Sequence, residues 1–213
     1  MDKGTRDELL SRLAEAVGSA TITRPTRVAI DGPPAAGKTT LAETLLAELS
    51  PQAAYVPLDG FHLAHHVLWE LGTVQRKGAP DTFDSAGYVA LLRRLRDPAE
   101  GTVYAPQFRR EIEDSLANAI PVPPGVPLVI TEGNYLLVQS GPWAELAGLL
   151  DEVWYLDVPE PARLRWLTGR HMHYGRSAAE AASRARGPDQ RNAELIEASK
   201  THADLIISVT PED

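Results

Sequence analysis

The segment from residue 27 to residue 40, RVAIDGPPAAGKTT, constrains the fold of this chain more than any other stretch. The four fixed positions of the phosphate-binding loop pattern G-x-x-x-x-G-K-[ST] are filled by Gly32, Gly37, Lys38 and Thr39. Apolar residues 28–30 predict a short strand before the loop, and residues 39–49 predict a helix after it. A strand, a glycine-bearing loop and a helix in this order indicate a site for a bound phosphate group.

The residue types in this loop suit an anion. Glycines at 32 and 37 let the backbone turn sharply, so that successive N–H groups point toward one place. The following helix aims its free N–H groups and positive dipole end at the same place. We expect Lys38 to meet the β- and γ-phosphates of a nucleotide and the Thr39 hydroxyl to ligate Mg²⁺. The predicted nucleotide-binding residues of the loop are Gly32, Pro33, Pro34, Ala35, Ala36, Gly37, Lys38, Thr39 and Thr40.

The composition predicts a single domain, residues 1–213, in the cytoplasm. The 213 residues are 43% apolar, enough for a layered core. The chain has no cysteine, which excludes disulfides, thiolate metal sites and a cysteine nucleophile. Apolar runs such as residues 127–130 are too short to span a bilayer, and the N-terminus has no basic-then-apolar signal, so we expect no membrane contact. A net charge of −8 argues against a nucleic-acid partner.

Apolar runs and helical stripes alternate along the chain. In the N-terminal segment 1–24, a helix is expected around residues 6–16. The predicted strands are 28–30, 53–58, 128–131, 153–158 and 204–209, and the predicted helices are 39–49, 85–96 with Ser85 as N-cap, and 159–170. This alternation predicts an α/β fold with a parallel sheet covered by helices on both faces. Ligands of such sheets gather at the carboxyl ends of the strands, where Asp31, Asp59 and Glu132 stand.

Six segments in a fixed order carry a resemblance to a known family. They read GPPAAGKTT, LDGFH, KGAPDTFD, VYAPQF, ITEGNYLL and an arginine-rich stretch, and together span about residues 25–210. This order resembles the family of uridine kinases, phosphoribulokinases and bacterial-type pantothenate kinases. The resemblance implies a P-loop NTPase three-layer fold with a mainly parallel five-stranded sheet and a helical lid at about residues 169–187. It also implies an enzyme that uses ATP and Mg²⁺ to phosphorylate a hydroxyl of a small molecule.

Asp59 is the expected catalytic base. Phosphoryl transfer to an alcohol requires positioning, charge neutralisation and a carboxylate near the hydroxyl. Asp59 ends a predicted strand, is followed by Gly60 so that the chain can turn, and matches the family's proposed catalytic aspartate. As an alternative, Asp59 caps a helix that begins near Phe61. The predicted catalytic residues are Asp59, Lys38 and Arg170.

Two further carboxylates match acidic positions of the family. By resemblance, Glu132 holds a Mg²⁺-bound water or orients the acceptor; as an alternative it is an exposed turn residue. Thr39 and Glu132 are therefore the predicted metal-binding residues. By resemblance, Asp84 accepts hydrogen bonds from acceptor hydroxyls, and its alternative role is helix capping beside Ser85.

The arginines in the last quarter of the chain are expected to differ in role. Arg170 and Arg176 resemble the mobile lid that closes over phosphates in this family, where a guanidinium spreads the charge of the transferring group. We assign Arg170 to catalysis and Arg176 to nucleotide binding, and we expect Arg165, Arg184 and Arg186 on the surface. The residues predicted to contact the acceptor are Phe61, His62, Asp84, Tyr104, Arg109, Glu132, Tyr135 and Arg163.

The sequence leaves the acceptor open. Uridine kinases usually have a histidine before P-D-x-F-D, where this chain has Ala79, and residues 104–109 replace the segment that helps read the pyrimidine. A divergent nucleoside- or sugar-kinase-like subgroup is therefore expected, although KGAPDTFD is closer to the pantothenate kinase version. His62, His65 and His66 share helical spacing, which suits either a transition metal or, more often, polar lining.

Two alternatives to a kinase stay open at this point. One is an NTPase switch whose conformation a protein partner reads, and the other is a nucleotide-binding module without turnover. Asp59 and Asp84 argue for the kinase, because holding a nucleotide requires neither. The preference between ATP and GTP and the oligomeric state, a homodimer included, stay open as well.

Overall fold

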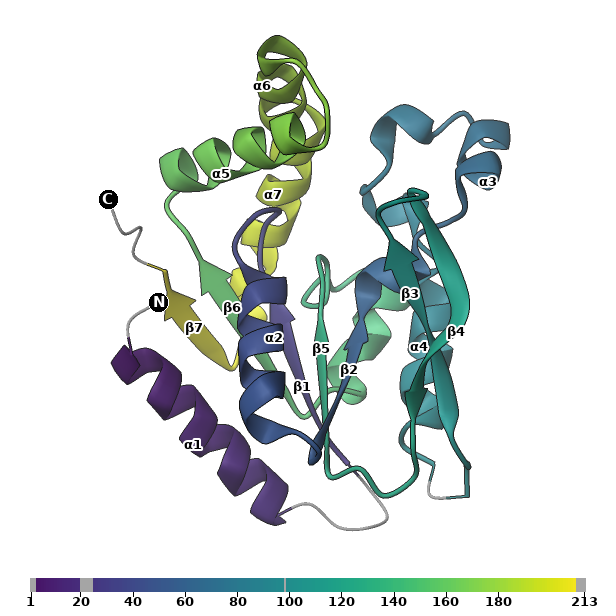
Figure 1. Ribbon diagram of the computed structural model, residues 1–213, viewed down its shortest axis with the longest axis vertical. Helices are drawn as coiled ribbons and strands as arrows, with labels where there is room; N and C mark the ends of the chain where they lie inside the picture. The colour runs from purple at the N-terminus through teal and green to yellow at the C-terminus, as the bar shows by residue number, and fades with distance from the viewer. Residues whose placement is uncertain (1–2, 20–24, 98, 210–213) are drawn as a thin grey trace.

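The computed structural model describes residues 3–19, 25–97 and 99–209 (Figure 1). The strands are β1 (Thr26–Asp31), β2 (Ala53–Pro57), β3 (Val103–Arg109), β4 (Asp114–Val122), β5 (Leu128–Glu132), β6 (Glu152–Asp157) and β7 (Leu205–Ser208). The helices are α1 (Lys3–Ser19), α2 (Lys38–Leu49), α3 (His65–Glu70), α4 (Ser85–Arg94), α5 (Glu160–His173), α6 (Ala178–Arg186) and α7 (Pro188–Ser199), and the 3₁₀ segments include η1 (Leu58–Phe61) and η4 (Gly141–Gly148).

Five parallel strands form the central sheet, in the order β2-β5-β1-β6-β7. β1 lies in the middle, where Ile30 pairs with Glu132 of β5 on one side and with Trp154 of β6 on the other. All neighbouring strands of this sheet run parallel, so the predicted parallel five-stranded sheet is confirmed. The strand order places the carboxyl ends of β2, β5 and β1 next to one another. Asp59, Glu132 and Asp31 stand at or just after these ends.

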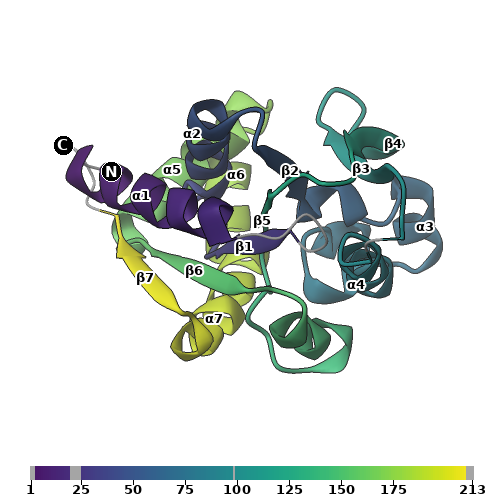
Figure 2. The same ribbon diagram turned by 90° about the horizontal axis from the view of Figure 1, so that it is seen from below.

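Alternate side chains along the central strands enter two separate cores. Val28 and Ile30 of β1 pack on the face covered by α1 and α2, whereas Ala29 between them faces the core formed with α4 and η4. α7 covers the second face as well, through its buried Ile196. Helices therefore lie on both faces of the sheet, as the view from below shows (Figure 2) and as the alternation along the chain predicts.

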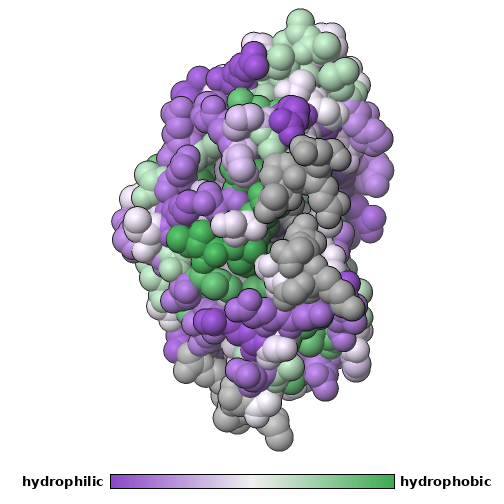
Figure 3. All heavy atoms as spheres, turned by 90° about the vertical axis from the view of Figure 1, so that its left-hand side faces the viewer, coloured by the Kyte–Doolittle hydropathy of each residue, from purple (hydrophilic) through white to green (hydrophobic). Residues whose placement is uncertain are grey.

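One edge of the sheet is formed by β7, beside α1. α1 covers residues 3–19 of the expected N-terminal segment 1–24, and residues 20–24 lie outside the described part of the chain. Apolar side chains gather in the middle of the face that carries α1 and β7 (Figure 3), and Ile206 of β7 is 47% exposed. Among the described residues, no helix has the length and apolar character that crossing a bilayer requires. The oligomeric state stays a prediction.

The start of α4 differs from the prediction by one residue. Asp84, and not Ser85, is the N-cap, because its carboxylate accepts the Gly87 N–H at 2.8 Å. An aspartate at this position satisfies one of the free N–H groups of the first turn. The helix ends at Arg94, before the predicted end at residue 96.

The antiparallel hairpin of β3 and β4 and the helix α3 are absent from the sequence-based prediction, whereas α6 lies within the helical lid expected at about residues 169–187. β3 and β4 form a separate two-stranded sheet whose register shifts between Ala105 and Gln107. Pro106 lies at this irregularity, where a residue without an N–H donor is tolerated in a strand pair. The hairpin packs against η1, the short segment that carries Asp59.

Candidate active site

The phosphate-binding loop curls around the side chain of its own lysine. Gly32 and Gly37 have φ of 150° and 93°, and a Cβ at Gly32 would lie 3.0 Å from the Leu156 carbonyl oxygen, so glycine is required there. The Lys38 Nζ donates to the Gly32 carbonyl oxygen at 2.7 Å and to the Asn134 Oδ1 at 2.9 Å. Burial lowers the pKa of Lys38. The ammonium is thus held where the loop and the start of α2 converge.

Asp31 holds the first residue of the phosphate-binding loop in place through hydrogen bonds to the backbone. Its carboxylate is fully buried and accepts the Gly32 N–H at 2.7 Å and the Leu137 N–H at 3.0 Å. Burial raises the pKa of Asp31 to about 7, against the opposing effect of the Lys38 charge. The two backbone contacts join the first residue of the loop to the segment after β5. Sequence reasoning placed Asp31 at a strand end without giving it this role.

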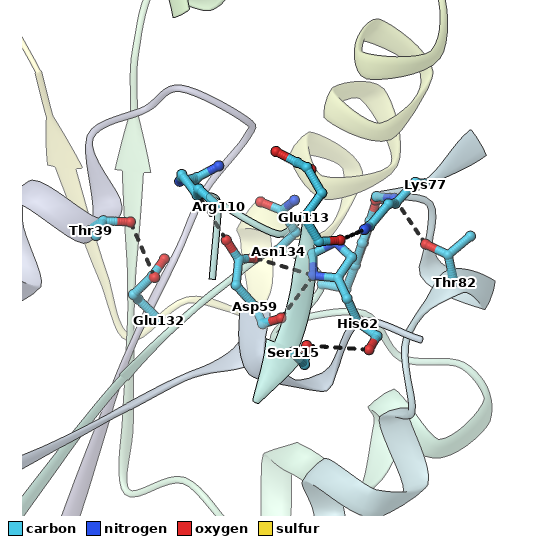
Figure 4. Close-up of polar contacts among 12 residues, drawn as sticks. Thr39, Asp59, His62, Lys77, Thr82, Arg110, Glu113, Ser115, Glu132 and Asn134 are labelled. Carbon is cyan, nitrogen blue, oxygen red and sulfur yellow. Dashed lines mark hydrogen bonds and ion pairs between the residues drawn. The ribbon is translucent and has the colours of Figure 1, made fainter. Parts of the chain in front are cut away.

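Glu132 is a buried carboxylate at the end of β5, not an exposed turn residue. Its Oε1 accepts hydrogen bonds from the Thr39 hydroxyl at 3.2 Å (Figure 4) and from the Tyr55 hydroxyl at 2.9 Å. Burial, and then the nearby charge of Asp59, raise the pKa of Glu132 to about 6. The structure therefore brings together the two residues predicted to bind a metal ion.

Asp59 lies in η1, which follows β2. The His62 Nδ1 is 2.9 Å from the Asp59 carbonyl oxygen, and the Arg110 Nη2 is 3.8 Å from its carboxylate (Figure 4). Gly60 is needed for close packing, because a Cβ there would lie 2.3 Å from the Pro106 carbonyl oxygen of β3. The hairpin thus holds the backbone beside Asp59 in place.

A cavity of about 850 Å³ joins these groups. The predicted residues that line it are Pro34, Ala35, Ala36, Gly37, Lys38, Thr39, Thr40, Asp59, His62, Glu132, Arg170 and Arg176. Arg170 keeps access to solvent through the open cavity, yet the protein atoms around it and then the Arg110 charge lower its pKa. The structure therefore brings the loop, the three predicted catalytic residues and both metal-binding residues to one place.

The remaining predicted residues do not line this cavity. Two of them, Gly32 and Pro33, lie behind the loop surface, and Lys38 donates to both of their carbonyl oxygens. Tyr104 is half exposed on β3, next to the inward-facing Val103 and Ala105. The others outside the cavity are Phe61, Asp84, Arg109, Tyr135 and Arg163.

Contacts of these residues explain where they lie. Phe61 packs on Tyr88 with ring centroids 5.1 Å apart, and Asp84 caps α4. Arg163 is buried and donates to the Gln190 side chain. The Tyr135 hydroxyl donates to the Gly78 carbonyl oxygen at 2.6 Å.

Several residues that line the cavity were not predicted to belong to the site. Arg184, expected on the surface, is half-buried and donates to the carbonyl oxygens of Gln75 at 3.1 Å and Lys77 at 2.8 Å. The expectation for Arg184 is thus wrong, whereas Arg165 and Arg186 are exposed as expected. The other residues that sequence reasoning missed include Lys77, Arg110, Asn134, Trp166, Tyr174, Asp189 and Asn192. A signal for Asn134 existed in the segment ITEGNYLL, which was already singled out.

The contacts of α6 and α7 reach across the cavity to the loop at residues 75–78. Besides Arg184, the Asn192 Nδ2 donates to the Gly78 carbonyl oxygen at 3.2 Å. The His171 Nε2 is 2.7 Å from the Asp189 carboxylate, which ties the end of α5 to the start of α7. α6, which lies in the lid expected at about residues 169–187, is therefore in contact with the opposite wall through Arg184; that it moves stays a prediction.

Comparisons with known proteins identify kinases that are similar to this chain. No protein-family model matches the chain. The ATP-dependent kinase-like protein notR' of Aspergillus versicolor is 36% identical over 149 residues, which cover 65% of this chain and 86% of the relative. A protein of Schizosaccharomyces pombe provisionally assigned as a uridine kinase, C227.14, is 28% identical over 217 residues, covering 97% of this chain and 91% of the relative.

A solved structure of a kinase is also similar to this chain. The crystal structure of a provisionally assigned fructose transport system kinase from Silicibacter sp. TM1040 has a TM-score of 0.86 and 36% identity to this chain, covering 95% of this chain and 98% of the other. This chain therefore belongs to the P-loop kinase family of uridine kinases, phosphoribulokinases and bacterial pantothenate kinases.

Proposed function

We propose that this kinase transfers the γ-phosphoryl group of ATP to a hydroxyl of a small molecule, with Asp59 as the general base. The observation that carries the proposal is that Asp59 shares one cavity with Lys38, Thr39 and Glu132. Phosphoryl transfer needs donor and acceptor aligned within one water-poor space, with the developing charge neutralised. A phosphate-binding loop and a carboxylate on the same cavity supply both requirements.

The residues present suit Mg²⁺ and a nucleoside triphosphate. Backbone N–H groups of the loop and the Lys38 ammonium would hold the phosphates, and Thr39 and Glu132 offer hard oxygen ligands whose atoms are 3.2 Å apart. Mg²⁺ is usually held by one or two protein groups together with substrate phosphates. The described residues include no cluster of three or more His, Cys, Asp or Glu side chains that could hold a metal ion by itself. When bound, Mg·ATP supplies the phosphoryl group.

The side chains around the transferring group would then have separate tasks. Asp59 accepts the proton of the acceptor hydroxyl as that oxygen attacks phosphorus. Arg170 and Arg176, which line the same cavity, donate to the phosphate oxygens and neutralise their charge. Glu132 is kept in place by the Tyr55 hydroxyl, so that its carboxylate has one orientation relative to Thr39.

Replacing Asp59 by asparagine tests the proposal. General-base catalysis is worth roughly 10²- to 10⁴-fold, so Asp59→Asn should lower kcat by at least about 100-fold while calorimetry shows nearly unchanged ATP affinity. ADP release is measured with nucleosides, sugars, pantothenate and other alcohols as acceptors. Asp7→Asn, an exposed change on α1 far from the cavity, is the matched control. Turnover of the Asp59→Asn variant close to that of the unaltered chain would remove Asp59 from the mechanism.

The same assay separates a kinase from an NTPase switch. A switch hydrolyses ATP at one slow rate whichever alcohol is present, because its product serves a conformational change. A kinase responds to one acceptor class with faster ADP release and a phosphorylated product. Detection of that product by mass spectrometry is the decisive readout.

A further inference from the structure

The charge on the cavity differs in sign from the charge of the chain. The chain has a net charge of −8. Six Lys and Arg side chains line the cavity against four Asp and Glu side chains, and these are Lys38, Lys77, Arg110, Arg170, Arg176 and Arg184 against Asp59, Glu113, Glu132 and Asp189. A cavity lined by an excess of one sign attracts ligands of the opposite sign.

These cations divide into groups by their place in the fold. Lys38 belongs to the phosphate-binding loop, and Arg170 and Arg176 come from α5 and the turn after it. Arg184 is already engaged, since it donates to two carbonyl oxygens and lies 3.9 Å from the Asp189 carboxylate. Lys77 and Arg110 are left, and both lie on the side of the cavity formed by the hairpin.

Arg110 stands beside the proposed base with its donors available. Its Nη2 is 3.8 Å from the Asp59 Oδ2, which is too long for a hydrogen bond, and its guanidinium lies 5.5 Å from the Tyr174 ring centroid. Within the described residues, the Arg110 guanidinium donates no hydrogen bond, and its contacts are this ion pair and the Tyr174 ring. A guanidinium has five N–H donors in a planar fork that matches a carboxylate or a phosphate.

Lys77 approaches the same turn of the hairpin. Its Nζ donates to the Glu113 carbonyl oxygen at 2.5 Å and lies 4.9 Å from the Phe108 ring centroid (Figure 4). The residue is half-buried, and in the described part of the chain no acidic side chain lies within ion-pair distance of its ammonium. The exposed Glu113 carboxylate lines the cavity too, but it forms no ion pair with Lys77. A partly desolvated ammonium without a carboxylate partner is suited to an incoming anion.

A continuous set of contacts links these cations to Asp59. His62 touches the Asp59 carbonyl oxygen and packs on Phe108 with ring centroids 5.2 Å apart, and Lys77 lies over the same Phe108 ring. Burial lowers the pKa of His62, whereas the Asp59 charge and carbonyl oxygen raise it. His62 and Phe108 thus connect Lys77 to Asp59, whereas Arg110 lies directly beside the Asp59 carboxylate.

We propose that the acceptor is an alcohol that also carries a carboxylate or a phosphate, and that Arg110 and Lys77 bind this anionic group while its hydroxyl meets Asp59. This inference rests on the proposed function, because it assigns the acceptor side of the same site. The anionic group would fix the acceptor's orientation, and charge-assisted hydrogen bonds to it discriminate against neutral alcohols by roughly 10- to 100-fold. A neutral sugar or nucleoside would offer these two cations no anionic group.

Matched pairs of acceptors test the inference. ADP release is measured with glycerol, D-glycerate and glycerol 3-phosphate, with pantothenol and pantothenate, and with fructose and fructose 1-phosphate. We expect kcat/KM for one anionic acceptor to exceed that of its neutral partner by at least about tenfold. Whether the preferred acceptor carries a carboxylate or a phosphate then identifies the anionic group that the site binds. Equal or better use of the neutral partner would overturn the inference while leaving the kinase intact.

Substitutions then test whether Arg110 and Lys77 produce the preference for an anionic acceptor. Arg110→Gln and Lys77→Gln should each lower the ratio of kcat/KM between the anionic and the neutral acceptor at least severalfold, and the ratio cancels general losses of folding or chemistry. Arg165→Gln, an exposed change on α5 outside the cavity, is the control. If Arg110→Gln lowers both rates equally, Arg110 serves only Asp59 and the inference fails.

A binding measurement covers the case in which no acceptor of the panel is phosphorylated. The protein is saturated with a non-hydrolysable ATP analogue and titrated with inorganic phosphate or acetate by calorimetry. We expect binding that Arg110→Gln weakens at least about tenfold. Absence of anion binding, or equal binding by the variant, would refute the inference. Failure of the analogue itself to bind would instead refute the proposed function.

Discussion

Replacing Asp31 by asparagine is expected to remove a large contribution to the dependence of folding stability on pH between about pH 4 and pH 7. The Asp31 carboxyl is fully buried, and burial raises its pKa from 3.8 to about 7. Three pKa units correspond to about 4 kcal/mol of difference between the folded and unfolded states.

The sign of this pH dependence follows from the number of protons bound by the folded and the unfolded chain. Below pH 4 the carboxyl is protonated in both states, and the stability associated with it is fully present. Between pH 4 and pH 7 the unfolded chain has released the proton and the folded chain has not, so the free energy of unfolding falls as pH rises. About 3 kcal/mol of this loss occurs between pH 5 and pH 8. Glu132, whose pKa is raised from 4.5 to about 6, adds about 2 kcal/mol in the same direction.

The assay is urea unfolding followed by tryptophan fluorescence at pH 5, 6, 7 and 8 and constant ionic strength. The unaltered chain and the exposed control Asp7→Asn should show the same change of stability with pH, whereas Asp31→Asn should lack the part of the slope that Asp31 contributes. The amide accepts one of the two N–H groups that Asp31 now holds, which costs about 1–3 kcal/mol at every pH and leaves the slope unchanged. A variant whose curve runs parallel to that of the unaltered chain would refute the assignment of a raised pKa to Asp31.

Two further predictions concern single contacts. Tyr55→Phe removes one of the two hydroxyl donors to Glu132, so the Mg²⁺ concentration for half-maximal activity should rise about tenfold; a titration of activity against free Mg²⁺ checks this, and an unchanged requirement would contradict it. Gly60→Ala forces a Cβ within 2.3 Å of the Pro106 carbonyl oxygen and should cost about 1–3 kcal/mol or more. Thermal unfolding measures the cost, with Gly169→Ala in α5, where a Cβ meets nothing within 4 Å, as the control expected to be neutral or stabilising. Equal stability of the two glycine variants would show that the hairpin adjusts.

The parallel sheet could be predicted because its strands are buried on both faces. Such strands read as apolar runs, so Val28, Ala29 and Ile30 identify β1 although they face two different cores. The β3–β4 hairpin gives no such signal. Most of its residues are partly or fully exposed, and Pro106 and Pro121 interrupt the pattern that would mark a strand.

The nucleotide end of the site was predictable for the same reason as the sheet. Residues that follow parallel strands meet at one edge, which is why Asp59 and Glu132 share a cavity with the loop after β1. The acceptor end has no such rule. Lys77, Arg110 and Arg184 come from three separate segments, and only the packing of the hairpin and of α6 brings them together. Tyr104 and Arg109 were chosen from the right segment, but the neighbouring Arg110 in the hairpin turn is the residue that reaches the cavity.

If Arg110 and Lys77 bind the acceptor as proposed, the hairpin is the part of this chain through which the acceptor can change while the nucleotide site stays the same. Lys38, Thr39 and Glu132 stand on the sheet and its first loop, and their hydrogen bonds do not involve the hairpin. Arg110 stands on the hairpin, and its link to the sheet passes through η1, where Gly60 allows the close approach of β3. A substitution in the hairpin turn therefore changes the charge beside Asp59 without moving the phosphate-binding loop. We expect relatives with other acceptors to differ first at the positions of Lys77 and Arg110.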